Sequence, residues 1–154
     1  MQFFRRHLPG RWAPVLLMAL AACHGSGRVL RAEDGWVRLA AVPGRPAAAY
    51  FTLHGGPQPV RLTAVESPEA GAAELHHSMA IGPGGMVGMQ PAAEVDVPAG
   101  GEVRFAPGAY HVMLFGLNAR VAAGGRITLR LRFDKAPPLS VEAQVIGAGD
   151  PAPY

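Results

Sequence analysis

Cysteine is almost absent from this chain of 154 residues, which contains a single one, Cys23. A lone cysteine excludes an internal disulfide, even in an oxidising compartment where disulfides persist. It also excludes, within this chain, a metal centre that needs two thiolates. The side chains that stabilise the fold and build any site must therefore be of other types.

Long apolar runs are lacking as well. The run at residues 13–20 is far shorter than the roughly 20 residues that a membrane-spanning helix needs. It follows the basic residues Arg5, Arg6 and Arg11 and leads into the small residues that precede Cys23. A basic start, a short apolar run and small residues at the cut are typical of a secretory signal, which we assign to residues 1–22.

The segment Leu20-Ala21-Ala22-Cys23 resembles a lipobox, in which the cysteine is acylated and becomes the new N-terminus. The resemblance implies that Cys23 carries a lipid that anchors the protein to a membrane, on the periplasmic side of a bacterial cell envelope. His24, rather than an Asp, follows the cysteine, which resembles the sorting pattern of outer-membrane lipoproteins. An ordinary secretory signal with a chance cysteine beside the cut is the alternative.

The chain without its signal also lacks an excess of charge. Three of the 14 basic residues lie in residues 1–22, so 11 basic residues remain against 11 acidic ones. The sequence pI of 9.6 therefore reflects mostly the signal. No basic run and no interleaving of basic and aromatic residues remains, and we expect no nucleic-acid binding.

No stretch after residue 34 has a long helical periodicity free of Gly and Pro. Short apolar or alternating runs occur instead, separated by turn signals such as Gly55-Gly56-Pro57, and residues 126–133 alternate polar and apolar side chains throughout. This pattern predicts an all-β fold, an antiparallel Greek-key β-sandwich. We expect strands at residues 35–40, 47–53, 60–65, 72–79, 86–91, 94–97, 102–105, 110–117, 126–133 and 139–146.

The length that remains after the signal predicts one domain. We expect a lipidated N-terminal tether at residues 23–34 and the β-sandwich domain at residues 35–147. Residues 148–154 are rich in Gly, Pro and Ala, which predicts a flexible tail.

Histidine and methionine gather between residues 76 and 113. The cluster contains His76, His77, His111, Met79, Met86, Met89 and Met113. Thioether and imidazole ligands together favour Cu(I), whereas carboxylates and carbonyls favour Mg²⁺, Ca²⁺ or Mn²⁺. On a strand, residues two apart share a face, so His111 and Met113 point the same way, whereas the adjacent His76 and His77 point to opposite faces. At most one of those two can join a given site. A partly exposed His beside a gap-filling Met is the alternative interpretation.

Residues 47–133 resemble the periplasmic copper chaperone family known as PCuAC. That family's signature is a His, a Met about a dozen residues later, then twenty-one residues and His-x-Met. Twenty-one residues separate Met89 from His111, and His111-Val112-Met113 supplies the His-x-Met. The flanking segments that also resemble the family are Gly35-Trp36-Val37-Arg38, Ala48-Ala49-Tyr50-Phe51-Thr52-Leu53 and Pro107-Gly108-Ala109-Tyr110.

The resemblance implies a cupredoxin-like sandwich that holds one Cu(I) through His76, Met89, His111 and Met113. It implies that the metal is passed by ligand exchange, without enzymatic turnover, to a copper-accepting protein such as the copper-A subunit of cytochrome oxidase or another copper chaperone. Twelve residues separate His76 from Met89, and eleven separate His77 from it, so His77 stays open as the alternative first ligand. The Met that often follows the family's first His is missing.

Three other functions are weighed against a copper chaperone. An electron-transfer cupredoxin needs a Cys thiolate beside two His, and Cys23 is assigned to lipid, so we reject it. A hydrolase is excluded because no serine has the context of a nucleophile elbow and no acidic residues are paired as acid and base. A metal-free β-sandwich interaction lipoprotein remains as the alternative.

Overall fold

The computed structural model describes residues 28–82 and 86–154. All regular elements in these residues are strands, which are β1 (Arg31–Arg38), β2 (Ala47–His54), β3 (Val60–Glu66), β4 (Ala72–Ile81), β5 (Met86–Pro91), β6 (Val95–Val97), β7 (Glu102–Phe105), β8 (Tyr110–Phe115), β9 (Arg126–Phe133) and β10 (Leu139–Ile146). In the described part of the chain, no helix is long and apolar enough to cross a membrane. The signal at residues 1–22 and the lipidation site Cys23 lie outside the described residues.

The ten expected strands are all present, and only the first differs clearly from its expected bounds. β1 begins at Arg31, four residues before the strand and the domain boundary that the sequence predicted. The polar start of β1 does not alternate, and its pairing with β2 shifts register between Glu33 and Trp36. Asp34, inside this irregularity, has a positive φ of 56°. An irregular strand of this kind hides the period of two on which the sequence prediction depended.

The strands form one sheet in the order β5-β4-β8-β7-β2-β1-β10-β9-β3-β6, with a further pairing of β8 with β2. The sheet folds over on itself, because β3 contacts β4 although the two are far apart in this order. Two neighbouring pairs, β1 with β10 and β7 with β8, are parallel, and the other pairs are antiparallel. The all-β sandwich is confirmed, whereas its Greek-key connectivity stays a prediction.

The main core lies between the folded layers, and in most strands alternate residues contribute to it. In β2, Phe51 and Leu53 are fully buried, and in β8 the same holds for Val112 and Leu114. Because side chains alternate along a strand, His111 and Met113 of β8 must point away from this core. The burial of β8 therefore decides which face of the sheet carries the predicted ligands.

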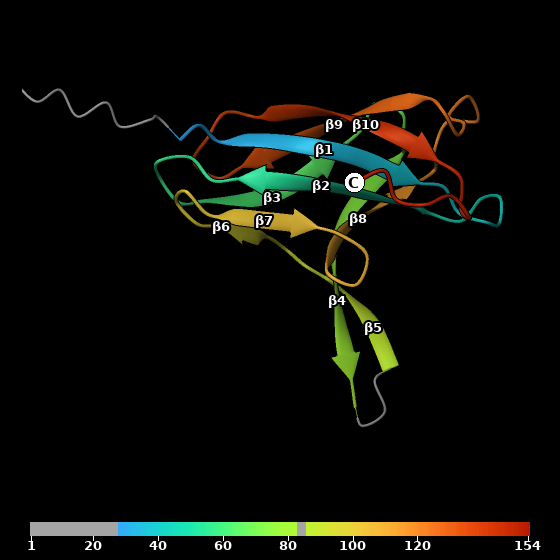
Figure 1. Cartoon of the computed structure of the whole chain (residues 1–154), viewed down its shortest axis with the longest axis horizontal. Coiled ribbons are helices and arrows are strands. Elements are labelled where there is room, and N and C mark those ends of the chain that lie inside the picture. The colour runs from blue at the N-terminus through green and yellow to red at the C-terminus, as the bar shows by residue number, and fades with distance from the viewer. Residues whose placement is uncertain (1–27, 83–85) are drawn as a thin grey trace, which may run out of the picture.

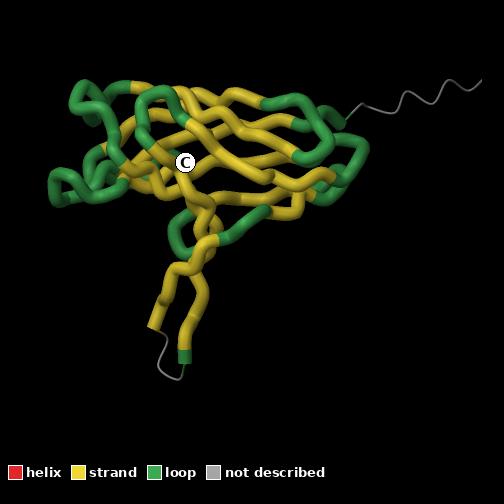
Figure 2. Tube along the Cα trace, turned by 180° about the vertical axis from the view of Figure 1, so that it is seen from behind, coloured by secondary structure: helices red, strands yellow, loops and turns green. Residues whose placement is uncertain are grey.

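The outer part of the β4–β5 hairpin projects from the body of the sandwich (Figures 1 and 2). We call its described residues, 78–82 and 86–89, the arm. No charged residue occurs between Glu74 and Glu94. The arm exposes four large apolar side chains to solvent, those of Met79, Ile81, Val87 and Met89.

Residues 148–154 follow β10. The guanidinium of Arg38 donates from Nη1 to the carbonyl oxygens of Ala148, at 3.1 Å, and Asp150, at 2.5 Å. The backbone N–H of Gly147 donates to Oδ2 of Asp150 at 2.7 Å. These hydrogen bonds connect the start of the tail to β1.

We expect the replacement Val112→Ala to lower the free energy of unfolding by about 2 kcal/mol, because it removes buried methyl groups and leaves a cavity in the core on the inner face of β8. Val87→Ala is the matched control, since Val87 is 67% exposed and its truncation should change stability by no more than about 0.5 kcal/mol. Denaturant unfolding of both variants measures the difference. Equal losses would contradict the assignment of Val112 to the core.

Candidate metal centre

A tight turn sets the start of β8 and so the position of the first predicted ligand on it. Pro107 and Gly108 are the central residues of the turn, Gly108 has a φ of 83°, and the N–H of Ala109 donates to the carbonyl oxygen of Ala106 at 3.0 Å. A proline followed by a residue with positive φ is the signature of a type II turn, which glycine fits without strain. The carbonyl oxygen of Ala109 is left to accept a hydrogen bond from the N–H of Ser78 at 3.1 Å, which joins this turn to β4.

Antiparallel pairing of β4 with β8 places His76 directly opposite His111. Their ring centroids are 5.8 Å apart. Directly opposed residues of an antiparallel pair point to the same face of a sheet. The two imidazoles therefore lie side by side on the face that is turned away from the core.

The two methionines join this face through the same pairing rules. Met113 follows His111 by two residues on β8, and Met89 of β5 pairs with Ser78, which follows His76 by two residues on β4. All four predicted ligands, from three neighbouring strands, thus share one face. Three of them, Met89, His111 and Met113, line a pocket of about 330 Å³ at the junction of the arm and the body.

His76 does not line that pocket, and its ring lies beside that of His111, which does. The other residues that line it are Ala48, Tyr50, Ser78, Val87, Pro107 and Gly108. The environment is largely apolar, and desolvation by burial raises the pKa of Tyr50. An apolar lining of this kind limits the access of competing water to a bound metal.

His77 points to the opposite face. Its ring stacks on that of Tyr110, with centroids 4.3 Å apart, and Tyr110 is its partner on β8. Strand parity predicted that only one of the adjacent histidines could share a face with His111. The structure places His76 there and His77 on the other side, and the assignment of either as a ligand stays a prediction.

Hydrogen bonds leave one nitrogen of each imidazole on this face free to bind a metal. Nδ1 of His111 lies 3.1 Å from the carbonyl oxygen of Ala109, and a carbonyl can only accept, so Nδ1 carries the proton. Nε2 of His76 lies 3.1 Å from Oε2 of Glu74, which assigns the proton to Nε2 in the same way. The remaining nitrogens, Nε2 of His111 and Nδ1 of His76, are buried and have no hydrogen-bond partner among the described residues.

A buried polar atom without a partner is costly, because folding removes it from water without compensation. Nε2 of His111 and Nδ1 of His76 are two such atoms on adjacent strands, and each has a free lone pair. They indicate a site that binds a metal ion. Metal-binding histidines typically donate their other N–H to a carboxylate or a backbone carbonyl, which fixes the ring and its tautomer. Glu74 and Ala109 supply both kinds of acceptor here.

Burial grades the four residues from buried His111, through half-buried His76 and Met113, to exposed Met89. His111 is only 4% exposed, whereas Met89, at the base of the projecting arm, is 61% exposed. Met113 is half-buried between Ala48 of β2 and Glu74 of β4, its partners in the sheet. A metal on this face would be held firmly from the β8 side and loosely from the β5 side.

Sequence analysis missed the two groups that orient the imidazoles. Glu74 stands two residues before His76, so the parity rule could have placed its carboxylate on the same face. No pattern could have identified the carbonyl of Ala109, because every residue has one. Its role depends on the turn at Pro107 and Gly108.

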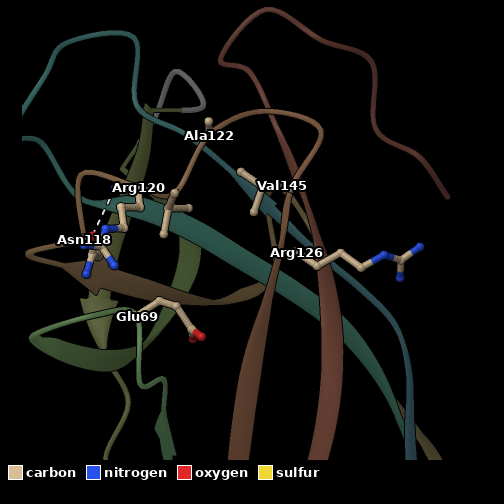
Figure 3. A pocket seen from close by; sticks show the side chains of 8 residues that line it. Glu69, Asn118, Arg120, Ala122, Arg126 and Val145 are labelled. Atoms are coloured by element: carbon tan, nitrogen blue, oxygen red, sulfur yellow. Dashed lines mark hydrogen bonds between the residues drawn. The ribbon is translucent and has the colours of Figure 1, made fainter.

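The described residues gather no metal site from His, Cys, Asp and Glu alone. No three His, Cys, Asp or Glu side chains in residues 28–82 and 86–154 gather closely enough to hold a metal ion, so any metal here needs the thioethers. A separate pocket of about 250 Å³ is lined by Glu69, residues of the loop between β8 and β9, Arg126 and Val145 (Figure 3). Its lining includes Glu69 and Asn118 but no His or Met, and Glu69 is already bonded to the hydroxyl of Ser67 at 2.8 Å.

Comparison with known proteins assigns the chain to a family. The model of the family described as "Putative lipoprotein LpqE-like" matches residues 30–145. The chain belongs to the LpqE-like family. It is also 32% identical over 105 residues to a protein of Leifsonia xyli subsp. xyli named "Putative lipoprotein Lxx21020". That match covers 68% of this chain and 61% of the relative, so the chain spans about three fifths of the relative's length.

Solved structures place the fold of this LpqE-like protein among PCuAC domains. The apo PCuAC domain from PmoF1 is 26% identical, with a TM-score of 0.62 over 77% of this chain and 93% of that domain. The solution structure of CuI-DR1885 from Deinococcus radiodurans is 28% identical, with a TM-score of 0.58 over 82% and 83%. The copper-bound PCuAC domain from PmoF2, at 23% identity and a TM-score of 0.63, shows the shared fold alone over 77% and 92%. These likenesses confirm the resemblance that the sequence predicted.

We expect the metal-free protein at neutral pH to carry the proton of His111 on Nδ1 and that of His76 on Nε2, because Ala109 and Glu74 accept from those atoms. Long-range ¹H–¹⁵N correlation spectra of the imidazole rings distinguish the two tautomers directly. A His111 ring protonated on Nε2 would contradict the assignment, since the nitrogen that faces the pocket would then have no lone pair.

Proposed function

We propose that this protein is a copper chaperone of the bacterial cell envelope. It holds one Cu(I) with His76, Met89, His111 and Met113 and passes the ion on by ligand exchange. The observation that carries the proposal is the pair of buried, unpartnered imidazole nitrogens that share one face with two thioethers. Two imidazoles and two thioethers form a soft set that suits Cu(I) without a thiolate.

The lack of charge on the four proposed donors favours release of the ion to a recipient. All four donors are neutral, so they compensate none of the positive charge of the ion. A recipient that offers a thiolate supplies both a soft donor and a negative charge, and can displace them. Because thioethers do not titrate and the site has no thiol to oxidise, it suits a compartment outside the cytoplasm.

Met89 is the ligand at which we expect exchange to begin. It is the most exposed of the four, and it lies on β5 at the edge of the sheet. An incoming ligand reaches the metal most easily from the side of β5, while His111 of β8 still binds the metal. The copper-A subunit of cytochrome oxidase and another copper chaperone are the recipients that we propose, and the process involves no turnover.

Support for the metal comes from a structural neighbour. The Deinococcus radiodurans protein, which is 28% identical to this chain, was solved with CuI. The names of the family and of the Leifsonia relative support an envelope lipoprotein. We propose that a lipid on Cys23 holds the protein on the periplasmic side, with the outer membrane as the favoured location.

One observation favours a second candidate function, that of a metal-free interaction lipoprotein. The arm exposes Val87 and Ile81 on an uncharged hairpin, and exposed apolar side chains of this kind often mark a surface for another protein. This function does not account for the two unpartnered imidazole nitrogens, which a binding surface does not require.

We expect the protein to bind one Cu(I) tightly in competition with a chromophoric chelator. Replacing a ligand should weaken this binding by roughly tenfold or more, since even the loss of an outer hydrogen-bond partner of a ligand costs about 10–100-fold. The variants are His76→Ala, Met89→Ala, His111→Ala and Met113→Ala. His77→Ala is the matched control, because it removes the neighbouring imidazole from the opposite face. An unchanged affinity in the His111 and Met113 variants would sink the proposal.

For the anchor, we expect Cys23→Ser to move the protein from the membrane fraction to the soluble periplasmic fraction of the expressing cells, because the hydroxyl cannot receive the lipid thioether. Fractionation followed by mass determination of the N-terminus measures both location and acylation. Cys23→Ser should leave Cu(I) affinity unchanged. A variant that remains membrane-bound would show that the cysteine is not the anchor.

A further inference from the structure

The proposed copper site leaves a second His-x-Met unused. His77-Ser78-Met79 on β4 has the same spacing as His111-Val112-Met113 on β8. By strand parity, His77 and Met79 share the face of β4 that is opposite to His76. The chain thus presents two imidazole–thioether pairs on the two faces of one sheet.

The spacing of His77 and Met79 allows both side chains to bind the same ion. Residues two apart on a strand are separated by about 6.6 Å along its axis. Imidazole and thioether side chains are long enough to meet across this distance, as the β8 pair must do at the proposed site. One nitrogen and one sulfur donor form a soft, low-coordinate set that suits Cu(I) and its analogue Ag(I).

The histidine of this pair is held in place at the junction of arm and body. Its ring stacks on Tyr110, with centroids 4.3 Å apart, and the ring of Tyr110 lies 5.7 Å from that of Phe105 in the core. His77 is half-buried, so its position is fixed by packing while part of its surface still meets solvent. An aromatic ring that merely caps the core would also stack in this way. A metal titration distinguishes a ring that caps the core from a ring that binds an ion.

The methionine of the pair is open to solvent. Met79 is 39% exposed, and its partner on β5 is Gly88, which presents no side chain against it. Ile81 fills the space above Gly88 instead, since a Cβ at that glycine would collide with Cδ1 of Ile81. The exposed part of the Met79 side chain gives an ion access to it from solvent.

We propose that His77 and Met79 form a second Cu(I) site, weaker than the first, on the opposite face of the β4–β5 hairpin. With only two donors from this chain, the site leaves coordination positions open for a ligand of a protein that delivers or accepts the ion. The identity of the metal rests on the proposed function, whereas the existence of the pair rests on the geometry of β4 alone.

The experiment is a titration of the protein with Ag(I), and then with Cu(I) under reducing conditions. It is followed by the ¹³C-methyl signals of the methionines and the ¹⁵N signals of the histidine rings. We expect Met89 and Met113 to shift with the first equivalent, and Met79 and His77 to shift together with the second.

Four variants separate the two sites. His77→Phe keeps a ring that stacks on Tyr110 but removes both nitrogens, and Met79→Leu keeps the volume but removes the sulfur. Each should abolish the second step and leave the first unchanged. Met113→Leu and His111→Phe should weaken the first step and leave the Met79 signal responsive.

Two outcomes would overturn the second site. Signals of Met79 and His77 that stay still beyond two equivalents would show that His77 only caps the core. A second step that survives His77→Phe and Met79→Leu would show that the ion binds elsewhere. Failure of the proposed function looks different, because Met89 and Met113 would then stay unshifted.

Discussion

The register of β4 against β8 is the constraint on which the rest of the site depends. It sets His76 opposite His111 and, through the next strand, brings Met89 alongside. A slip of one residue would turn His77 to this face and His76 to the other. The register is held from both sides, since Leu75 and Val112 are buried as partners in the core and the Ala109 carbonyl accepts from the Ser78 N–H.

Around this register the four proposed ligands differ in burial. The imidazole of His111 is buried in the body of the sandwich and hydrogen-bonded to backbone. Met89, by contrast, projects from an edge strand that has a neighbour on one side only. A carrier must hold its ion and still release it, and an exposed thioether beside a buried imidazole meets both needs. The uncharged arm around Met89 adds no electrostatic barrier to the approach of the proposed recipient.

Much of this arrangement could be predicted from the sequence, because it depends on a period of two. Short apolar or alternating runs between turn signals located nearly every strand, and parity showed that His111 and Met113 share a face and that His76 and His77 do not. Which of the two histidines faces His111 depends on cross-strand register, and register is a tertiary property that a single sequence does not contain. The sequence did not predict that β1 begins at Arg31, because the irregularity near Asp34 breaks the alternation of side chains along the strand.

The direct test of the central claim is X-ray absorption spectroscopy of the Cu(I)-loaded protein. The account predicts a first coordination shell of two nitrogen and two sulfur scatterers in wild type. The sulfur contribution should be lost in the double variant Met89→Leu, Met113→Leu, while the nitrogen contribution remains. A shell made only of nitrogen and oxygen scatterers in wild type, or a sulfur contribution that survives in the double variant, would contradict it.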